Sequence, residues 1–254
     1  MRLTAGVLFG TLAAFGGAAN VPDVEISPGV HLPLVGLGTW EYNSTRAGAA
    51  VALALELGYT HIDTAWTYHN SKGIGAALKA SKRPRSSYFI TSKVDGDNNA
   101  SRTLYEAEED LQNLGLVYVD LLLLHWPSSS KAKRQEQWRV LERFYREGKA
   151  RAIGVSHYCE RHITDILEIA TVKPVINQVQ YHVGMGSAGV NATDMSFSFG
   201  RQHNITYQSF SPLCGPCGTD ELLSGELVTT IGKKHNKTGA QVRTAPTARN
   251  SPPL

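Results

Sequence analysis

The sequence predicts an α/β protein, a TIM-type (β/α)8 barrel that lacks its eighth β/α unit. Short apolar runs alternate with amphipathic stretches along the chain, a pattern typical of repeated β-α units. No such unit opens with the G-x-G-x-x-G turn of a dinucleotide-binding sheet. Polar and titratable residues recur where successive strands should end, and this is the rim at which barrel active sites assemble.

Composition limits the class of protein. The 254 residues are 42% hydrophobic, which is enough to bury a sizeable core. Lys and Arg number 25 against 22 Asp and Glu, and this small surplus is scattered along the chain, so we expect no nucleic-acid partner. Three cysteines are too few for a disulfide scaffold. The composition therefore indicates a globular enzyme or binding domain.

Residues 1–19 have the pattern of a signal peptide. Leu3–Phe15 is uncharged and mostly apolar, and Gly16–Ala19 offers a cleavage site after Ala19. Thr4 and Thr11 make the segment too weakly hydrophobic for a retained membrane anchor. A disordered extension or an organellar transit segment is the alternative. We expect the secretory pathway or the extracellular space as the location.

Asparagine sequons agree with passage through a glycosylating compartment, and they predict a glycoprotein. They lie at Asn43, Asn99, Asn191, Asn204 and Asn236. No later segment resembles a membrane span, because even the apolar run Leu121–Leu124 follows Asp120.

Seven strands are expected after the leader, each as a short apolar run. They are Leu34–Leu37, Thr60–Asp63, Tyr88–Ser92, Val117–Leu124, Ala152–Val155, Pro174–Gln178 and Ile205–Phe210. Helices are expected between them, with apolar stripes that pack on the sheet. They are Thr45–Leu57 ending at Gly58, Thr103–Leu114, Gln135–Glu147 and a helix after Glu160.

Glycine spacing favours a barrel over an open doubly wound sheet. Gly36 and Gly38 lack the third glycine of a dinucleotide turn, because Glu41 stands in its place. Gly73 and Gly75 fail in the same way. We interpret both pairs as tight turns or close backbone packing.

Four titratable residues are placed for chemistry at one rim: Asp63, Tyr68, Lys93 and His125. A tyrosine can protonate a carbonyl oxygen, but its ordinary pKa near ~10 makes it a poor donor unless its surroundings change. Lys93 could lower that pKa, Asp63 could hold Lys93 by an ion pair, and His125 could orient or polarise the carbonyl. This set would make a carbonyl-reducing acid that lacks only a hydride donor.

Ordered motifs in this chain resemble those of the aldo-keto reductases from about Val24 to Val242. The motifs are Gly36–Trp40, His61–Ala65 with Tyr68, Thr91–Lys93, Leu124–Pro127, Gly154–Tyr158, Asn177–His182 and Ser209–Leu213. The resemblance implies one barrel domain over residues 20–242, acting as a monomer. Val24–Leu32 resembles the hairpin that closes the bottom of that barrel.

The resemblance also implies roles for the site residues. Tyr68 would be the general acid, tuned by Lys93 and Asp63, with His125 positioning a small-molecule carbonyl substrate and NADPH supplying hydride. NADPH would be bound by Thr39, Trp40, Ser156, His157, Gln178, Phe210, Ser211 and Leu213. His157 stands where the family has Asn and Phe210 where it has Tyr, while Trp40 and Trp126 would line the substrate mouth.

Residues 243–254 depart from the family pattern. Thr244–Leu254 holds three prolines and cannot supply a buried strand, so we expect a disordered tail. The eighth strand, the last helix and the family's I-P-K-S segment, which holds the 2′-phosphate, would then be missing. A gene-model error, which we favour, a truncated isoform or a degenerate paralogue would each explain this, and the chain would then be a catalytically impaired binding barrel.

The cysteine pair Cys214–Cys217 has C-x-x-C spacing, so a thiol-redox protein is a third, weaker hypothesis. The pair follows a late strand instead of opening a helix, which favours an incidental loop role. We expect no metal site, because there is no second cysteine pair and His203 is isolated.

Overall fold

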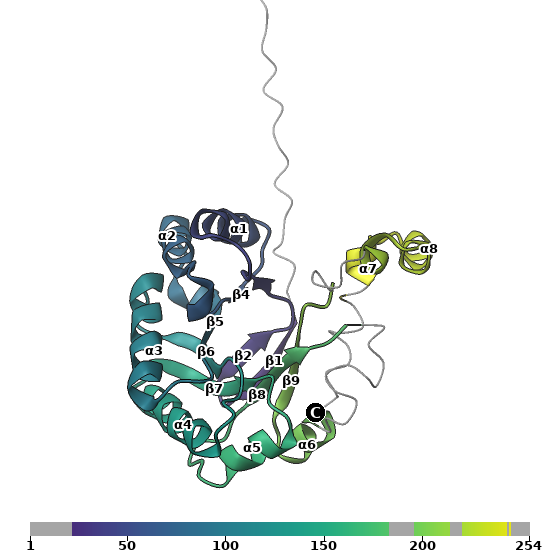
Figure 1. Cartoon of the computed structure of the whole chain (residues 1–254). Helices are drawn as coiled ribbons and strands as arrows, with labels where there is room; N and C mark the ends of the chain where they lie inside the picture. The colour runs from purple at the N-terminus through teal and green to yellow at the C-terminus, as the bar shows by residue number, and fades with distance from the viewer. Residues whose placement is uncertain (1–21, 183–195, 214–219, 243, 245–254) are drawn as a thin grey trace, which may run out of the picture.

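The computed structural model describes residues 22–182, 196–213, 220–242 and 244, and its centre is a parallel sheet. Seven strands follow one another in chain order across this sheet, and the helices α1 to α6 lie along its outer face (Figure 1). The strands are β3 (Leu37–Gly38), β4 (His61–Asp63), β5 (Phe89–Val94), β6 (Val119–Leu124), β7 (Ala150–Ser156), β8 (Ile176–Gln180) and β9 (Thr206–Phe210). The curled sheet with alternating helices confirms the predicted barrel class.

Four of the helices were expected, with ends that shift by at most four residues. These are α1 (Ser44–Glu56), α3 (Ala100–Leu114), α4 (Lys131–Arg146) and α5 (Glu160–Leu167). The remaining elements lacked a long apolar stripe and were not predicted. They are η1 (Trp66–Tyr68), α2 (Ser71–Ser81), η2 (Arg85–Ser87), α6 (Ser196–Gln202), α7 (Glu221–Ser224) and α8 (Glu226–His235).

The first barrel strand is shorter than predicted and starts later. The Leu34 N–H donates to Pro22 O at 2.9 Å, so this part of the expected strand continues the N-terminal hairpin instead of the sheet. Only Leu37 and Gly38 pair with β4. The expectation of a strand over Leu34–Leu37 is therefore wrong, because the apolar run serves two elements.

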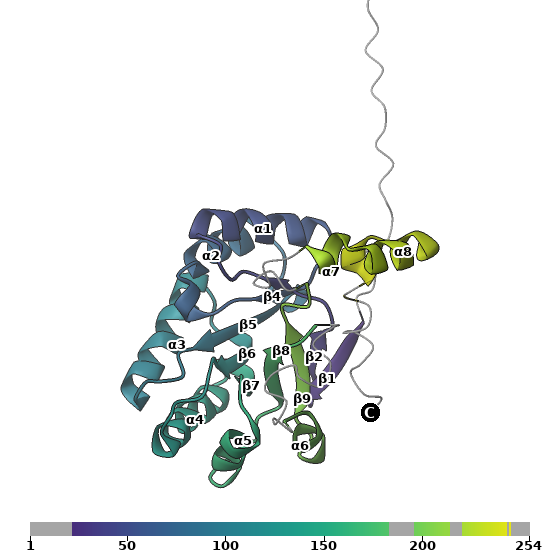
Figure 2. The same cartoon turned by 45° about the vertical axis from the view of Figure 1, so that its right-hand side comes forward.

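An antiparallel hairpin closes the bottom of the barrel, as the resemblance implied. It consists of β1 (Asp23–Ser27) and β2 (Val30–Pro33), which turn at Gly29 (Figure 2). Its apolar side chains form one buried cluster with inward side chains of four strands. The cluster contains Ile26, Val30, Leu32, Phe89, Leu121, Leu123, Ala152 and Ile176. This plug leaves the opposite rim as the place where a ligand can enter.

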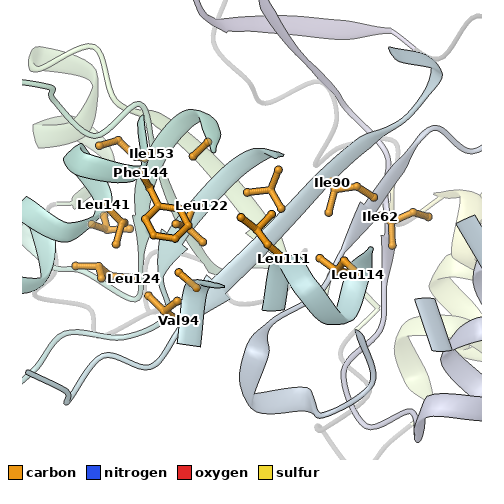
Figure 3. Packing of buried hydrophobic residues seen from close by; sticks show 14 of the residues in the cluster. Ile62, Ile90, Val94, Leu111, Leu114, Leu122, Leu124, Leu141, Phe144 and Ile153 are labelled. Atoms are coloured by element: carbon orange, nitrogen blue, oxygen red, sulfur yellow. The ribbon is translucent and has the colours of Figure 1, made fainter. Parts of the chain in front are cut away.

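The second core lies between the sheet and its helices. Figure 3 shows Leu111 and Leu114 of α3, and Leu141 and Phe144 of α4, packed over outward side chains of the strands. Because side chains of a strand alternate, the same strands feed both cores. Both faces are buried, which explains the continuous apolar runs in the sequence.

Glycines allow the first two helices to approach closely. A Cβ at Gly73 of α2 would lie 1.8 Å from Ser44 O of α1. A second close approach lies outside these helices, where a Cβ at Gly36 would lie 2.5 Å from the His61 ring. Close packing is thus confirmed for Gly73 and Gly36, but not for Gly38, where a Cβ would have no atom within 4 Å. Gly58 follows α1 with a left-handed φ of 89°, as expected for a helix-ending glycine.

Strands β3 and β9 form the two ends of the seven-stranded sheet, so the described residues contain no eighth strand. A cavity of about 200 Å³ lies between these ends and is lined by Gly38, Asp63, Gln178 and Phe210 among others. Within the described ranges no helix is long and apolar enough to cross a membrane. The predicted signal peptide, the sequon at Asn191, the pair Cys214–Cys217 and, apart from Thr244, the predicted tail fall outside those ranges.

Candidate active site

Three consecutive strands deliver the four predicted catalytic residues to one rim. Asp63 ends β4, Lys93 lies next to the end of β5, and His125 follows β6. Tyr68 ends the short helix η1, which follows β4. The parallel register pairs Asp63 with Thr91 and Lys93 with Leu123, so each strand places its site residue two positions further along than the preceding strand does. The structure therefore brings all four residues together.

Lys93 forms the buried centre of the site, with a side chain that is only 1% exposed. Its ammonium donates to Asp63 Oδ1 and to Thr64 O, the second at 3.0 Å. Burial by itself would lower the pKa of Lys93, but the Asp63 carboxylate reverses this effect and raises the pKa above its usual value. Lys93 is thus a fixed positive charge.

Tyr68 lies against this charge, with its ring centroid 5.4 Å from Lys93 Nζ. Burial raises the pKa of the Tyr68 hydroxyl, and the charge and hydrogen bond of Lys93 act in the opposite direction. The net direction is upward, which differs from the sequence argument that Lys93 would lower the pKa. The reason is desolvation, which disfavours the phenolate more strongly than the ammonium favours it.

His125 approaches Tyr68 from the other side. Its Nε2 lies 3.5 Å from the Tyr68 hydroxyl, and its Nδ1 lies 3.2 Å from Thr67 Oγ1. Burial, with the nearby charges of Lys93 and His157, lowers the pKa of His125 to about 3. The imidazole is consequently neutral at ordinary pH and can orient a polar group without carrying charge.

Polar side chains of β7, β8 and β9 continue the rim. Gln178 Nε2 donates to Asp63 Oδ2 at 2.7 Å and also lies 3.2 Å from Gln208 Oε1. Ser156 Oγ donates to Gln178 O at 2.8 Å, which leaves its lone pairs free to accept. Asp63 therefore holds both Lys93 and one of the predicted cofactor residues.

Aromatic groups surround the open side of the rim. His157 and Phe210 meet edge to face with their centroids 5.0 Å apart. Trp40 is 49% exposed and Trp126 is 37% exposed, as expected of residues at a substrate mouth. Thr39 is fully buried, as Ser156 and Gln178 nearly are, and its hydroxyl donates to Asp63 O at 3.1 Å.

Ser211 and Leu213 lie just beyond the end of β9. Ser211 has a left-handed φ of 50°, so the chain turns sharply there. This turn follows directly after Phe210, at the same rim as the other predicted cofactor residues.

Two buried asparagines that sequence reasoning did not assign hold the loops of the site. Asn70 Nδ2 donates to Thr39 O at 2.8 Å and to Tyr42 O at 3.0 Å. Asn177 Nδ2 donates to Tyr158 O at 2.7 Å and fixes the loop after β7. The signal for Asn177 lay in its motif beside Gln178, whereas Asn70 had none.

No group of three or more His, Cys, Asp or Glu side chains in the described part of the chain could hold a metal ion.

Comparison with known proteins agrees with this geometry. The sequence model of the "Aldo/keto reductase family" matches residues 34–245. The 9,11-endoperoxide prostaglandin H2 reductase of Trypanosoma cruzi is 37% identical over 225 residues, covering 88% of this chain and 76% of that protein. The glyoxal reductase of Bacillus subtilis is 38% identical over 221 residues, covering 86% of this chain and 76% of that protein.

Solved structures give the same result. An aldo/keto reductase from Brucella melitensis superposes with a TM-score of 0.78 at 34% identity, covering 88% of this chain and 82% of that one. An aldo-keto reductase of Bombyx mori in complex with NADP superposes with a TM-score of 0.74 at 25% identity, covering 87% and 78%. The chain belongs to the aldo-keto reductase family, an oxidoreductase family of NAD(P)-dependent carbonyl reduction.

The residues present fit the nicotinamide end of such a cofactor. Ser156, His157 and Gln178 offer a hydroxyl, an imidazole and an amide beside the ring of Phe210, and this donor set suits a carboxamide on a flat aromatic ring.

Proposed function

We propose that this chain reduces aldehydes or ketones to alcohols with NADPH, using Tyr68 as the general acid. The observation that carries the proposal is the contact of Tyr68 with both Lys93 and His125 at the open rim. When bound, the cofactor supplies the hydride. The protein supplies the proton and the groups that place the carbonyl.

The proton is held on Tyr68 Oη until the carbonyl oxygen gains negative charge. Burial raises the pKa of Tyr68, so the hydroxyl stays protonated before reaction. The Lys93 ammonium then stabilises the phenolate that is left, and Asp63 keeps this ammonium in place.

Neutral His125 places the substrate oxygen. If Thr67 Oγ1 donates to Nδ1, the single ring proton lies on Nε2, which faces the Tyr68 hydroxyl. Nε2–H can then donate to the same carbonyl oxygen that Tyr68 protonates. Trp40 and Trp126 give this mouth apolar walls, which suits small carbonyl compounds such as the glyoxal named for the Bacillus subtilis relative.

Replacing the hydroxyl tests the mechanism. We expect Tyr68→Phe to lower kcat by about 100-fold to 10,000-fold, because a general acid contributes that much, while NADPH binding changes little. Tyr59→Phe removes an exposed hydroxyl and is the matched control. Retained turnover in Tyr68→Phe would exclude Tyr68 as the proton donor.

In the described residues no strand joins the edge strands β3 and β9. This opening favours a second candidate, a barrel that binds the cofactor weakly and does not turn over substrate. Titration with NADPH and then NADH, followed by tryptophan fluorescence, separates the two candidates. Binding of NADPH at micromolar concentration with aldehyde reduction supports the reductase. Weak binding without aldehyde reduction, in a cooperatively folded protein, supports the second candidate.

We also propose that the protein is a monomeric glycoprotein of the secretory pathway. Exposure of Asn43, Asn99, Asn204 and Asn236 supports this proposal. Expression in a secreting eukaryotic cell should give medium-borne protein whose mass falls on glycosidase treatment and whose sedimentation fits one chain. Retention in the cell with unmodified mass would refute it.

A further inference from the structure

Asp110 of α3 is a buried carboxylate that the mechanism above does not use. The residue is only 3% exposed. Its Oδ1 accepts a hydrogen bond from Ser71 Oγ at 2.5 Å, and its Oδ2 accepts one from Ser92 Oγ. Each carboxylate oxygen is thus bound to a hydroxyl from a different element, because Ser71 begins α2 and Ser92 lies in β5.

Both serines adjoin the acid–base pair. Ser71 follows Tyr68 by three residues and begins α2, directly after the short connection from η1. Ser92 directly precedes Lys93, and side chains of a strand alternate, so Lys93 points to the barrel interior while Ser92 points outward to α3. Asp110 therefore joins the Tyr68 segment to the Lys93 strand from outside the sheet.

The surroundings of Asp110 make it an unfavourable place for a carboxylate. Burial raises the pKa of Asp110, and the charge of Glu109 on the same helix adds to this effect. The two serine hydroxyls, from α2 and β5, and the Lys93 ammonium act in the opposite direction. A carboxyl group keeps both connections in either protonation state, because the acid form can donate to one serine and accept from the other.

We propose that Asp110 is a positioning residue that sets the separation between the Tyr68 hydroxyl and the Lys93 ammonium. This inference rests on the proposed reductase function. Asp110 lies on the rigid helix α3 and binds both Ser71 and Ser92, so it fixes their two segments relative to each other. Without this connection the phenol and the ammonium are free to drift apart, and small displacements of reacting groups are costly to rate.

The kinetic test compares Asp110→Ala with Asp110→Asn. Alanine removes both connections, whereas asparagine has the same shape and can accept from one serine and donate to the other. We expect kcat to fall by about 100-fold in Asp110→Ala and the KM for NADPH to stay within about twofold, because only the acid–base geometry is disturbed. Asp110→Asn should keep kcat within about threefold of the wild type.

Glu142→Ala is the matched control. Glu142 of α4 is also a buried carboxylate that accepts hydrogen bonds from another segment, but it lies away from the rim. Its loss should lower stability without lowering kcat at a temperature where the variant is folded. A comparable fall in kcat would mean that any buried carboxylate has this effect, which would overturn the proposal.

A readout independent of turnover separates this inference from the reductase proposal. In protein labelled with ¹³Cζ-tyrosine, Tyr68→Phe identifies the Tyr68 resonance. We expect the resonance to move in Asp110→Ala and to stay in place in Asp110→Asn and Glu142→Ala. An unmoved resonance in Asp110→Ala overturns the positioning role, whereas absence of wild-type turnover overturns only the reductase function. If Asp110→Ala does not fold, Ser71→Ala replaces it, because it removes only one of the two connections. We then expect a smaller fall in kcat and a smaller movement of the Tyr68 resonance.

Discussion

The neutral state of His125 predicts a specific pH dependence of stability. Burial and the charges of Lys93 and His157 lower the pKa of His125 from 6.5 to about 3 in the folded chain. Above pH 6.5 the folded and unfolded states both carry a neutral imidazole, so its contribution to stability is complete. As the pH falls below 6.5, the unfolded chain takes up a proton that the folded chain refuses, and this contribution is lost.

The size of the effect follows from these two pKa values. Between pH 7 and pH 5 the uptake of about 0.7 proton by the unfolded state alone lowers the free energy of unfolding by about 2 kcal/mol. His61, His157 and His162 also have lowered pKa values, so the total loss is larger than the share of His125. The difference in free energy of unfolding between the wild type and a His125 variant isolates the contribution of His125.

The assay is urea unfolding of the wild type and of His125→Gln at pH 7, 6 and 5. The stability difference between the two proteins should shrink by about 2 kcal/mol from pH 7 to pH 5, because glutamine does not titrate. His235→Gln removes an exposed imidazole outside the barrel and controls for the loss of a histidine. A difference that stays constant within ~0.5 kcal/mol would show that His125 titrates alike in both states, and would refute the neutral-imidazole mechanism.

Three further predictions concern stability. Gly73→Ala should destabilise the protein by about 1–3 kcal/mol in thermal unfolding, because the new Cβ meets Ser44 O at 1.8 Å, while Gly38→Ala, with no atom within 4 Å, should have little effect. Glu142→Ala should cost about 1–3 kcal/mol in urea unfolding, because it leaves two part-buried N–H groups and a hydroxyl without their acceptor. Asn43→Ala should cost about 1 kcal/mol through loss of the α1 cap, and Asn43→Ser should restore most of it; equal losses in the two would contradict a capping role.

The alternation of strands and helices was predictable from sequence because both faces of each strand are buried. Runs such as Leu121–Leu124 are apolar throughout, and the stripes of α3 and α4 have helical spacing. Helix α2 was missed because two glycines interrupt its apolar pattern. Those glycines are required because the backbones of α1 and α3 pack closely against α2 there. A requirement set by a neighbouring helix leaves no periodic signal within the segment itself.

By itself, the sequence determined the kind of fold and the identity of the four rim residues. Asp63, Lys93 and His125 stand at or just beyond strand ends, and parallel strands carry their ends to a common edge. Only the tertiary structure decided their electrostatic state. The pKa of Tyr68 is raised and that of His125 is lowered because burial depends on side chains from many elements. The connection of Ser71 to Ser92 through Asp110 is likewise a contact between residues far apart in the chain, which no local pattern encodes.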